Sequence, residues 1–256
     1  MHVNRTPRIA FVTLGCAKNE VDTDKMQARL AAAGFSIVDD VDDADLVIVN
    51  TCAFLASAVE EGLEVIFDLV GRENAAGREL KVLVAGCMPA RYGDDLAAEL
   101  VEAAGFLAAD DEDNVVEEVT RLLDGDVSLV RADRSLIRHA YPTSAYVKIS
   151  DGCDRFCSYC MIPHIRGRYR SYPLSRIDDE VAELVCNGVR EIVLIGQDTG
   201  IWGHDLEEPS TTATLVRTLA HRYPDTWFRL LYVQPEGIDD ELLDVIATYP
   251  NVCTYL

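Results

Sequence analysis

Short apolar runs and helix-like stretches alternate along the first 123 residues of the chain. Continuous apolar runs of this length predict buried strands, and the longer stretches between them predict helices. We expect strands at 8–14, 35–39, 45–50, 81–86 and 105–110, and helices at 20–33, 54–70, 91–104 and 114–123. Alternation of this kind is typical of a parallel sheet covered on both faces. The pattern therefore predicts an α/β fold, with a doubly wound parallel-sheet domain over residues 1–123.

The same alternation resumes after residue 144. Strands are expected at 145–150, 191–196, 227–233 and 252–256, and helices at 175–187, 210–222 and 238–248. Repeated βα units indicate a barrel or an open sheet, and four strands do not close a barrel, so residues 145–256 are predicted to form a partial (βα) barrel. Residues 124–144 contain Gly, Pro and mixed charges without a clear period, and they are predicted to be a linker.

The short apolar runs and the acidic net charge argue against a membrane-spanning protein and against a general polyanion binder. The apolar runs are far shorter than the roughly 18 residues that a membrane span needs, and the N-terminus has no secretory signal, so we expect a cytoplasmic location and no membrane partner. The formal net charge of -21 argues against a general polyanion-binding surface. The acidic segments at 39–45 and 110–113 are expected to be solvated loops.

Eight cysteines in a reducing compartment favour metal or redox chemistry over disulfides. Cys16, Cys52 and Cys87 each follow a predicted strand of the first domain. The carboxyl ends of parallel strands share one edge of the sheet, where ligand sites occur. We therefore expect these three thiols to converge at that edge.

A second group of cysteines, Cys153, Cys157 and Cys160, lies in the stretch DGCDRFCSYC. Cys157 and Cys160 alone would suit a redox-active dithiol. Zinc could recruit His164 as a fourth ligand. The third interpretation is a four-iron cluster that is held by three thiolates and leaves one iron open to an external ligand.

DGCDRFCSYC, placed just after a predicted strand, resembles the cysteine loop of radical S-adenosylmethionine (SAM) enzymes, with Tyr159 as its aromatic residue. The resemblance implies a 4Fe-4S cluster on the three cysteines of this loop, with SAM bound at the open iron. It also implies that Gly196, Gln197 and Asp198 lie near the methionyl group of SAM. An ordinary turn after a strand remains the alternative for these three residues.

A three-cysteine α/β domain before such a unit is similar to the methylthiotransferases, and this implies a second 4Fe-4S cluster on Cys16, Cys52 and Cys87. TLGCAKNEVDTDKM and AYVKISDGCDRFCSYCMIPHIRGRYRS resemble the RimO type more closely than the MiaB type. The RimO type transfers a methylthio group to the β-carbon of an aspartate in protein twelve of the small ribosomal subunit. Methylthiolation of a tRNA adenosine, the MiaB reaction, is the alternative. The resemblance assigns no catalytic residue.

The partners that this resemblance implies are the ribosomal protein and an electron donor such as flavodoxin or ferredoxin. Arg166, Arg168 and Arg170, interleaved with Tyr169, could contact nearby ribosomal RNA or pair with neighbouring acids. Asn19, at a predicted helix start, is interpreted as an N-cap.

Members of this family continue into further barrel strands and a C-terminal TRAM domain, and neither is present in this sequence. We therefore expect a truncated chain. An inactive fragment that only binds clusters or a partner is kept as an alternative to the enzyme.

Overall fold

The computed structural model describes residues 6–123 and 143–256, and the chain divides into two compact units. Unit 1 comprises residues 1–138 and unit 2 comprises residues 139–256. Most of the predicted linker, residues 124–142, lies outside the described residues. The domain boundaries predicted from the sequence therefore stay a prediction.

Unit 1 is built on one parallel sheet of five strands in the order β2-β1-β3-β4-β5. Its strands are β1 (Arg8–Thr13), β2 (Ser36–Ile37), β3 (Leu46–Thr51), β4 (Lys81–Gly86) and β5 (Gly105–Ala108). Every residue of β3 is buried, as a central strand with both faces covered requires. This confirms the doubly wound α/β fold expected from the apolar runs.

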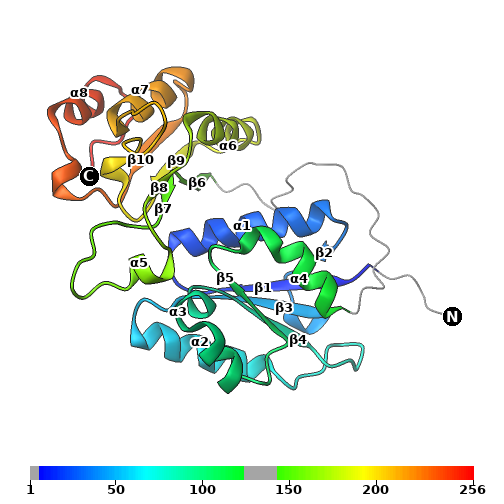
Figure 1. Ribbon diagram of the computed structural model, residues 1–256. Helices are drawn as coiled ribbons and strands as arrows, with labels where there is room; N and C mark the ends of the chain where they lie inside the picture. The colour runs from blue at the N-terminus through cyan, green and yellow to red at the C-terminus, as the bar shows by residue number, and fades with distance from the viewer. Residues whose placement is uncertain (1–5, 124–142) are drawn as a thin grey trace. The chain divides into compact units, whose positions relative to one another are not determined.

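Helices cover both faces of this sheet (Figure 1). One face carries α1 (Ala17–Ala32) and α4 (Val115–Leu122), and the other carries α2 (Ala56–Leu69) and α3 (Cys87–Glu99). Met26 and Leu30 of α1 and Val115 and Val119 of α4 share one apolar core with the strands. The described part of unit 1 also contains two 3-10 turns, η1 (Val41–Asp43) and η2 (Glu112–Asn114).

Two helices of unit 1 begin earlier than the sequence pattern predicts. Helix α1 begins at Ala17 instead of residue 20, and α3 begins at Cys87 instead of residue 91. Cys16 is consequently the N-cap residue of α1, and Asn19 lies inside the first helical turn. The interpretation of Asn19 as an N-cap is therefore wrong, because the helix has already started when the chain reaches it.

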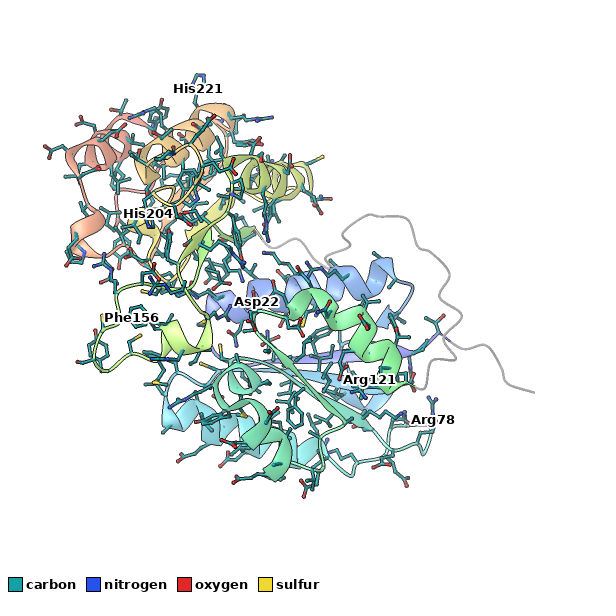
Figure 2. The ribbon with its side chains drawn as sticks, in the orientation of Figure 1. Asp22, Arg78, Arg121, Phe156, His204 and His221 are labelled. Atoms are coloured by element: carbon teal, nitrogen blue, oxygen red, sulfur yellow. The ribbon has the colours of Figure 1, made fainter. Side chains whose placement is uncertain are left out.

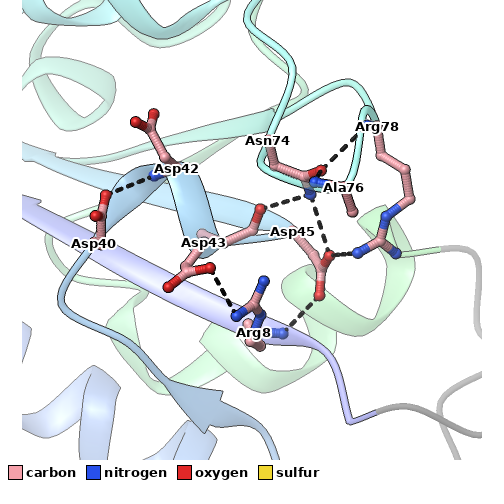
Figure 3. A network of polar contacts seen from close by, with 9 residues as sticks. Arg8, Asp40, Asp42, Asp43, Asp45, Asn74, Ala76 and Arg78 are labelled. Carbon is pink, nitrogen blue, oxygen red and sulfur yellow. Dashed lines mark hydrogen bonds and ion pairs between the residues drawn. The ribbon is translucent and has the colours of Figure 1, made fainter.

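The acidic segment 39–45 lies at the amino-terminal edge of the sheet, opposite the edge at which the strands end (Figure 3). Asp42 and Asp43 are exposed as predicted, but the side chain of Asp45 is only 10% exposed. Its carboxylate accepts a hydrogen bond of 2.8 Å from the backbone N–H of Arg8 and is also paired with Arg78. Asn74 closes the network with a 2.9 Å hydrogen bond from its Nδ2 to the carbonyl of Ala44.

Unit 2 contains a parallel sheet of three strands in the order β10-β9-β6. Its strands are β6 (Ser144–Lys148), β9 (Glu191–Ile195) and β10 (Trp227–Leu230), and its long helices are α6 (Leu174–Cys186), α7 (Thr212–Arg222) and α8 (Asp240–Thr248). Alternate strand residues such as Val147, Leu194 and Phe228 pack with all three helices in one core. This is the βα arrangement that the second half of the sequence predicts.

Two local features of unit 2 differ from the prediction. The expected strand at 252–256 is wrong: the segment forms one isolated parallel bridge, between Phe228 and Val252, and its last residues are exposed. The pattern also missed a short antiparallel hairpin of β7 (Ser150–Asp151) and β8 (Arg170–Ser171), together with α5 (Ile162–Ile165), η3 (Thr199–Ile201) and η4 (Pro235–Gly237).

Across residues 6–123 and 143–256, no helix is long and apolar enough to cross a membrane.

Candidate functional site

Cys16, Cys52 and Cys87, called the rim site below, follow three neighbouring strands of unit 1. Cys52 and Cys87 come directly after β3 and β4, and Cys16 comes three residues after the end of β1. In the strand order β2-β1-β3, the direction of winding reverses between β1 and β3, and ligands bind open α/β sheets at this switch point. The strand order therefore places the rim site where such folds bind ligands.

Asn19 lies among the three thiols of the rim site. Its Oδ1 is 3.8 Å from the Sγ of Cys16 and 3.8 Å from the Sγ of Cys87. Cys52 lies beside Gly15, where an added Cβ would lie 2.6 Å from the Cβ of Cys52 and 3.4 Å from the Nδ2 of Asn19. Gly15 has a φ of +99°, so glycine is required there by both conformation and space. The fold thus confirms the expected convergence of strand ends.

The chemistry of the rim site fits an iron-sulfur cluster. All eight cysteines are free thiols, and Cys87 is buried while Cys16 and Cys52 are partly exposed. Within the described residues, no three His, Cys, Asp or Glu side chains are placed to hold a single metal ion. In a four-iron cluster each thiolate binds a different iron, so the ligand sulfurs stand farther apart than they do around one ion.

Cys153, Cys157 and Cys160, called the loop site below, lie on the segment between β7 and α5. Cys157 is exposed, and Cys153 and Cys160 are half-buried; burial raises the pKa of the Cys153 thiol. Gly152 has a φ of +73°, and a Cβ there would overlap the carbonyl oxygen of Arg168. The loop therefore starts with a turn that only glycine fits.

Arg155 ties the loop site to the segments that follow β9 and β10. Its Nε donates a 2.6 Å hydrogen bond to Oδ2 of Asp198, which follows β9, and its Nη1 lies 3.1 Å from the carboxylate of Glu236 in η4. The Asp198 side chain is fully buried, and its Oδ1 also accepts a hydrogen bond from the backbone of Gly200. A charged pair in this setting holds the loop in a defined position on the sheet.

Asp154 and Phe156 provide further contacts of the same loop. Asp154 accepts a 3.0 Å hydrogen bond from the backbone N–H of Tyr169 and pairs with Arg168 at 3.0 Å. Figure 2 shows Phe156 on this segment, and its φ of +46° is unusual for a residue with a side chain. The guanidinium of Arg168 lies 5.2 Å from the centroid of the Phe156 ring. His164, the alternative zinc ligand, meets the Phe156 ring edge-on at 6.3 Å between centroids.

A buried group of charges joins residues from before and after the loop. Lys148 Nζ is 2.8 Å from Oδ2 of Asp151, and Arg166 Nη1 is 3.5 Å from the same oxygen. The side chains of Lys148 and Arg166 are only 1% and 3% exposed. Burial alone would raise the pKa of Asp151, but Lys148 and Arg166 outweigh it and lower that pKa to about 2. Asp151 is therefore a carboxylate that fixes the first turn of the loop.

The residues expected near SAM are in different environments. Gly196 and Asp198 are buried beside the loop site, and Asp198 is engaged by Arg155. The Oε1 of Gln197 is buried and has no hydrogen-bond partner within the part of the chain that the structure describes. A buried acceptor of this kind fits a polar ligand that donates to it. Tyr159 is 82% exposed.

The basic segment at 166–170 contains both buried and exposed residues. Arg166 is buried in its pair with Asp151, and Tyr169 is 7% exposed, with burial raising its pKa to about 12. The pairing of arginines with nearby acids is therefore confirmed for Arg166 and Arg168. Arg168 and Arg170 keep exposed side chains.

Sequence reasoning missed the roles of Asn19, Arg155 and Lys148 because each depends on a partner distant in sequence or hidden in the fold. Arg155 lies between two cysteines of the loop, which was a usable signal, but nothing identified Asp198 as its partner. The pairing of Asn19 with Cys87 joins residues that are 68 positions apart.

Comparisons with known proteins agree with the two-unit organisation. Residues 8–108 match the uncharacterized protein family UPF0004, and residues 147–255 match the radical SAM superfamily. Among solved structures, the radical SAM methyltransferase TsrM from Kitasatospora setae, with cobalamin and a 4Fe-4S cluster bound, is similar with a TM-score of 0.61 and 14% identity. The match covers 95% of this chain and 57% of TsrM. At this identity the likeness supports the fold alone.

Relatives with higher sequence identity than these structures share one name, RimO. The ribosomal protein uS12 methylthiotransferase RimO of Syntrophus aciditrophicus is 41% identical over 264 residues, which covers 98% of this chain and 58% of the relative. RimO of Geobacter sulfurreducens is also 41% identical, covering 99% of this chain and 58% of the relative. The chain thus spans somewhat more than half the length of these relatives. Two matched units and these relatives together lead to one conclusion: the chain belongs to the radical SAM methylthiotransferase family, RimO type.

Proposed function

We propose that this chain carries the cluster-binding units of an enzyme that transfers a methylthio group to the β-carbon of an aspartate in ribosomal protein uS12. The observation that carries the proposal is the presence of two three-cysteine sites, one in each unit, in a chain 41% identical to RimO proteins. Because the chain spans 58% of those relatives, the activity of the whole protein is part of the proposal.

In this proposal, the loop site holds a 4Fe-4S cluster with SAM as its external ligand, and the rim site holds a second 4Fe-4S cluster. When bound, these groups supply the one-electron chemistry that acts on an unactivated carbon, and they also supply the sulfur that is inserted. The protein supplies position and burial. Arg155 and Asp198 fix the loop, and the buried Oε1 of Gln197 offers an acceptor to a polar group of SAM.

Charge supports a basic protein as substrate. The net charge of -21 favours encounter with a basic ribosomal protein over binding to nucleic acid in general. Arg168 and Arg170 are the exposed cations beside the loop site, and we assign them to any contact with ribosomal RNA near the substrate. A reducing protein such as flavodoxin or ferredoxin would supply electrons, and the cytoplasm is the expected compartment.

Mass spectrometry of a strain that lacks the gene tests this proposal. Protein uS12 should lose the mass of a methylthio group at one aspartate, while methylthiolated tRNA adenosine stays unchanged. Re-expression of the gene should restore the modification, whereas a copy with Cys153→Ala should not. Loss of the tRNA modification with intact uS12 would instead assign the MiaB reaction, and loss of neither would contradict the methylthiotransferase assignment.

A further inference from the structure

The side chain of Asn19 occupies the centre of the rim site and makes contacts in two directions. It is fully buried in the first turn of α1. Its Nδ2 donates one 2.9 Å hydrogen bond to the carbonyl of Leu14 and another to the carbonyl of Thr51. Leu14 follows β1, and Thr51 is the last residue of β3, directly before Cys52. Both protons of the amide nitrogen therefore tie together two strand ends that carry rim cysteines.

The two carbonyl partners also fix which way the carboxamide faces. Carbonyl oxygens accept only, so the nitrogen must face Leu14 and Thr51, and the oxygen must face the other way. In that direction lie the thiols of Cys16 and Cys87, each 3.8 Å from Oδ1. One side chain thus contacts two of the three rim sulfurs and holds the backbone beside the third.

Neighbouring residues hold Asn19 itself in place. Asn50 Nδ2 donates a 2.9 Å hydrogen bond to the backbone carbonyl of Asn19 and a 3.0 Å bond to Thr23 Oγ1. Thr51 Oγ1 donates to the carbonyl of Ala85 at 2.7 Å, at the end of β4. This buried network joins the ends of β1, β3 and β4, and the hydrogen bonds of Asn19 and Asn50 fix the arrangement of these strand ends.

We propose that Asn19 is the positioning residue of the rim site, which sets the spacing of the rim thiols to which a cluster binds. This inference rests on the proposed function, because it assumes that the rim site holds a 4Fe-4S cluster. Side chains that contact ligating sulfurs tune both the affinity and the electronic properties of a metal site. Asn19 is in this position without being a ligand.

The test isolates the rim cluster by replacing Cys153, Cys157 and Cys160 with alanine in the full chain. Asn19→Ala and the milder Asn19→Ser, which keeps one hydrogen-bond donor, are made in that background. The matched control is Asn74→Ala, because Asn74 is also a buried asparagine of unit 1 but lies at the amino-terminal edge of the sheet (Figure 3). Each protein is reconstituted anaerobically, and thermal unfolding of the apoprotein reports the loss of stability.

Two readouts separate positioning from general stability: the rate of iron release to a chelator, and the electron paramagnetic resonance spectrum of the reduced cluster. We expect Asn19→Ala to release iron about 10-fold to 100-fold faster than its parent. We also expect both Asn19 variants to change the spectrum, and Asn74→Ala to leave rate and spectrum as in the parent. Equal release rates in Asn19→Ala and Asn74→Ala, with unchanged spectra, would contradict the role of Asn19 alone. A parent that binds no iron would contradict the proposed second cluster, and the role of Asn19 with it.

Discussion

The rim site and the loop site each present three thiols, but the fold brings these thiols together in different ways. The rim cysteines come from three strand ends and lie 36 and 35 residues apart, so their geometry depends on a folded parallel sheet. The loop cysteines lie within eight residues, and their geometry depends on how one segment is anchored. The hydrogen bonds around Asn19 in the rim site come from neutral amides and hydroxyls, whereas ion pairs hold the loop site.

This difference shows two ways of keeping a ligand set in place. A site built on several strands needs few dedicated contacts, because the packed sheet already fixes the backbone. A site on a loop needs anchors at both ends and in the middle, and Asp151, Asp154 and Arg155 provide them. Buried charges are suitable anchors only when they are paired, because removing one partner leaves the other charge buried without compensation.

Replacing one cysteine of either site should remove the iron of that site alone. Cys52→Ala should remove the iron of the rim site and leave that of the loop site, and Cys153→Ala should do the reverse. Each variant should therefore retain about half of the wild-type iron, since we propose that each site holds one cluster. Iron analysis after anaerobic reconstitution measures this, with Cys186→Ala, an exposed cysteine at the end of α6, as the control. Loss of all iron in either variant would show that the sites are not independent.

The next effect tests the charge network beneath the loop. Asp151→Asn leaves Lys148 and Arg166 buried beside a neutral group, and removing one partner of a buried ionic group is expected to destabilise unit 2 by about 3–5 kcal/mol. Denaturant unfolding measures the change. Glu241→Gln, which breaks the exposed pair of Arg217 and Glu241, is the control and should change stability by about 0–1 kcal/mol. Similar values for the two variants would contradict the anchoring role of Asp151.

A smaller effect is expected at the middle anchor of the loop. Arg155→Met leaves the fully buried Asp198 carboxylate without its guanidinium, and an unpaired buried polar group costs about 1–3 kcal/mol or more. The loop site should then lose iron to a chelator faster, while the rim site is unaffected. Adding Asp198→Asn should recover stability, because the unpaired charge is gone. Faster iron loss from the rim site instead would refute the assignment of Arg155 to the loop.

The smallest effect concerns the exposed surface of the loop. Arg168→Ala removes the exposed guanidinium over Phe156 together with its pair to Asp154, and such contacts contribute only about 0.5–1 kcal/mol. We expect unchanged iron content and a small decrease in melting temperature. A large loss of iron in this variant would show that Arg168 anchors the loop as strongly as Arg155 does.

The contrast between the sites also explains what the sequence could predict. Apolar runs located the strands of both units well, because buried parallel strands are continuous apolar segments. That placement was enough to expect Cys16, Cys52 and Cys87 at one edge. The loop cysteines were evident from spacing alone.

Contacts between distant residues were not predictable in the same way. Asn19 was interpreted as a cap because the start of α1 was placed three residues too late, which hid its contact with Cys87. Asp198 was expected to contact SAM, and its pairing with Arg155 depends on how the loop folds back over β9. The strand expected at 252–256 shows the opposite error, since an apolar pattern indicated a strand where only one bridge forms.

The central claim is that each unit holds its own four-iron cluster on three thiolates. Iron and acid-labile sulfide analysis of the anaerobically reconstituted chain, combined with Mössbauer spectroscopy, tests it most directly. We expect about eight irons per chain in two 4Fe-4S clusters, and about four in a variant that lacks all three loop cysteines. One equivalent of zinc without iron, or four irons that all disappear with the loop cysteines, would contradict it.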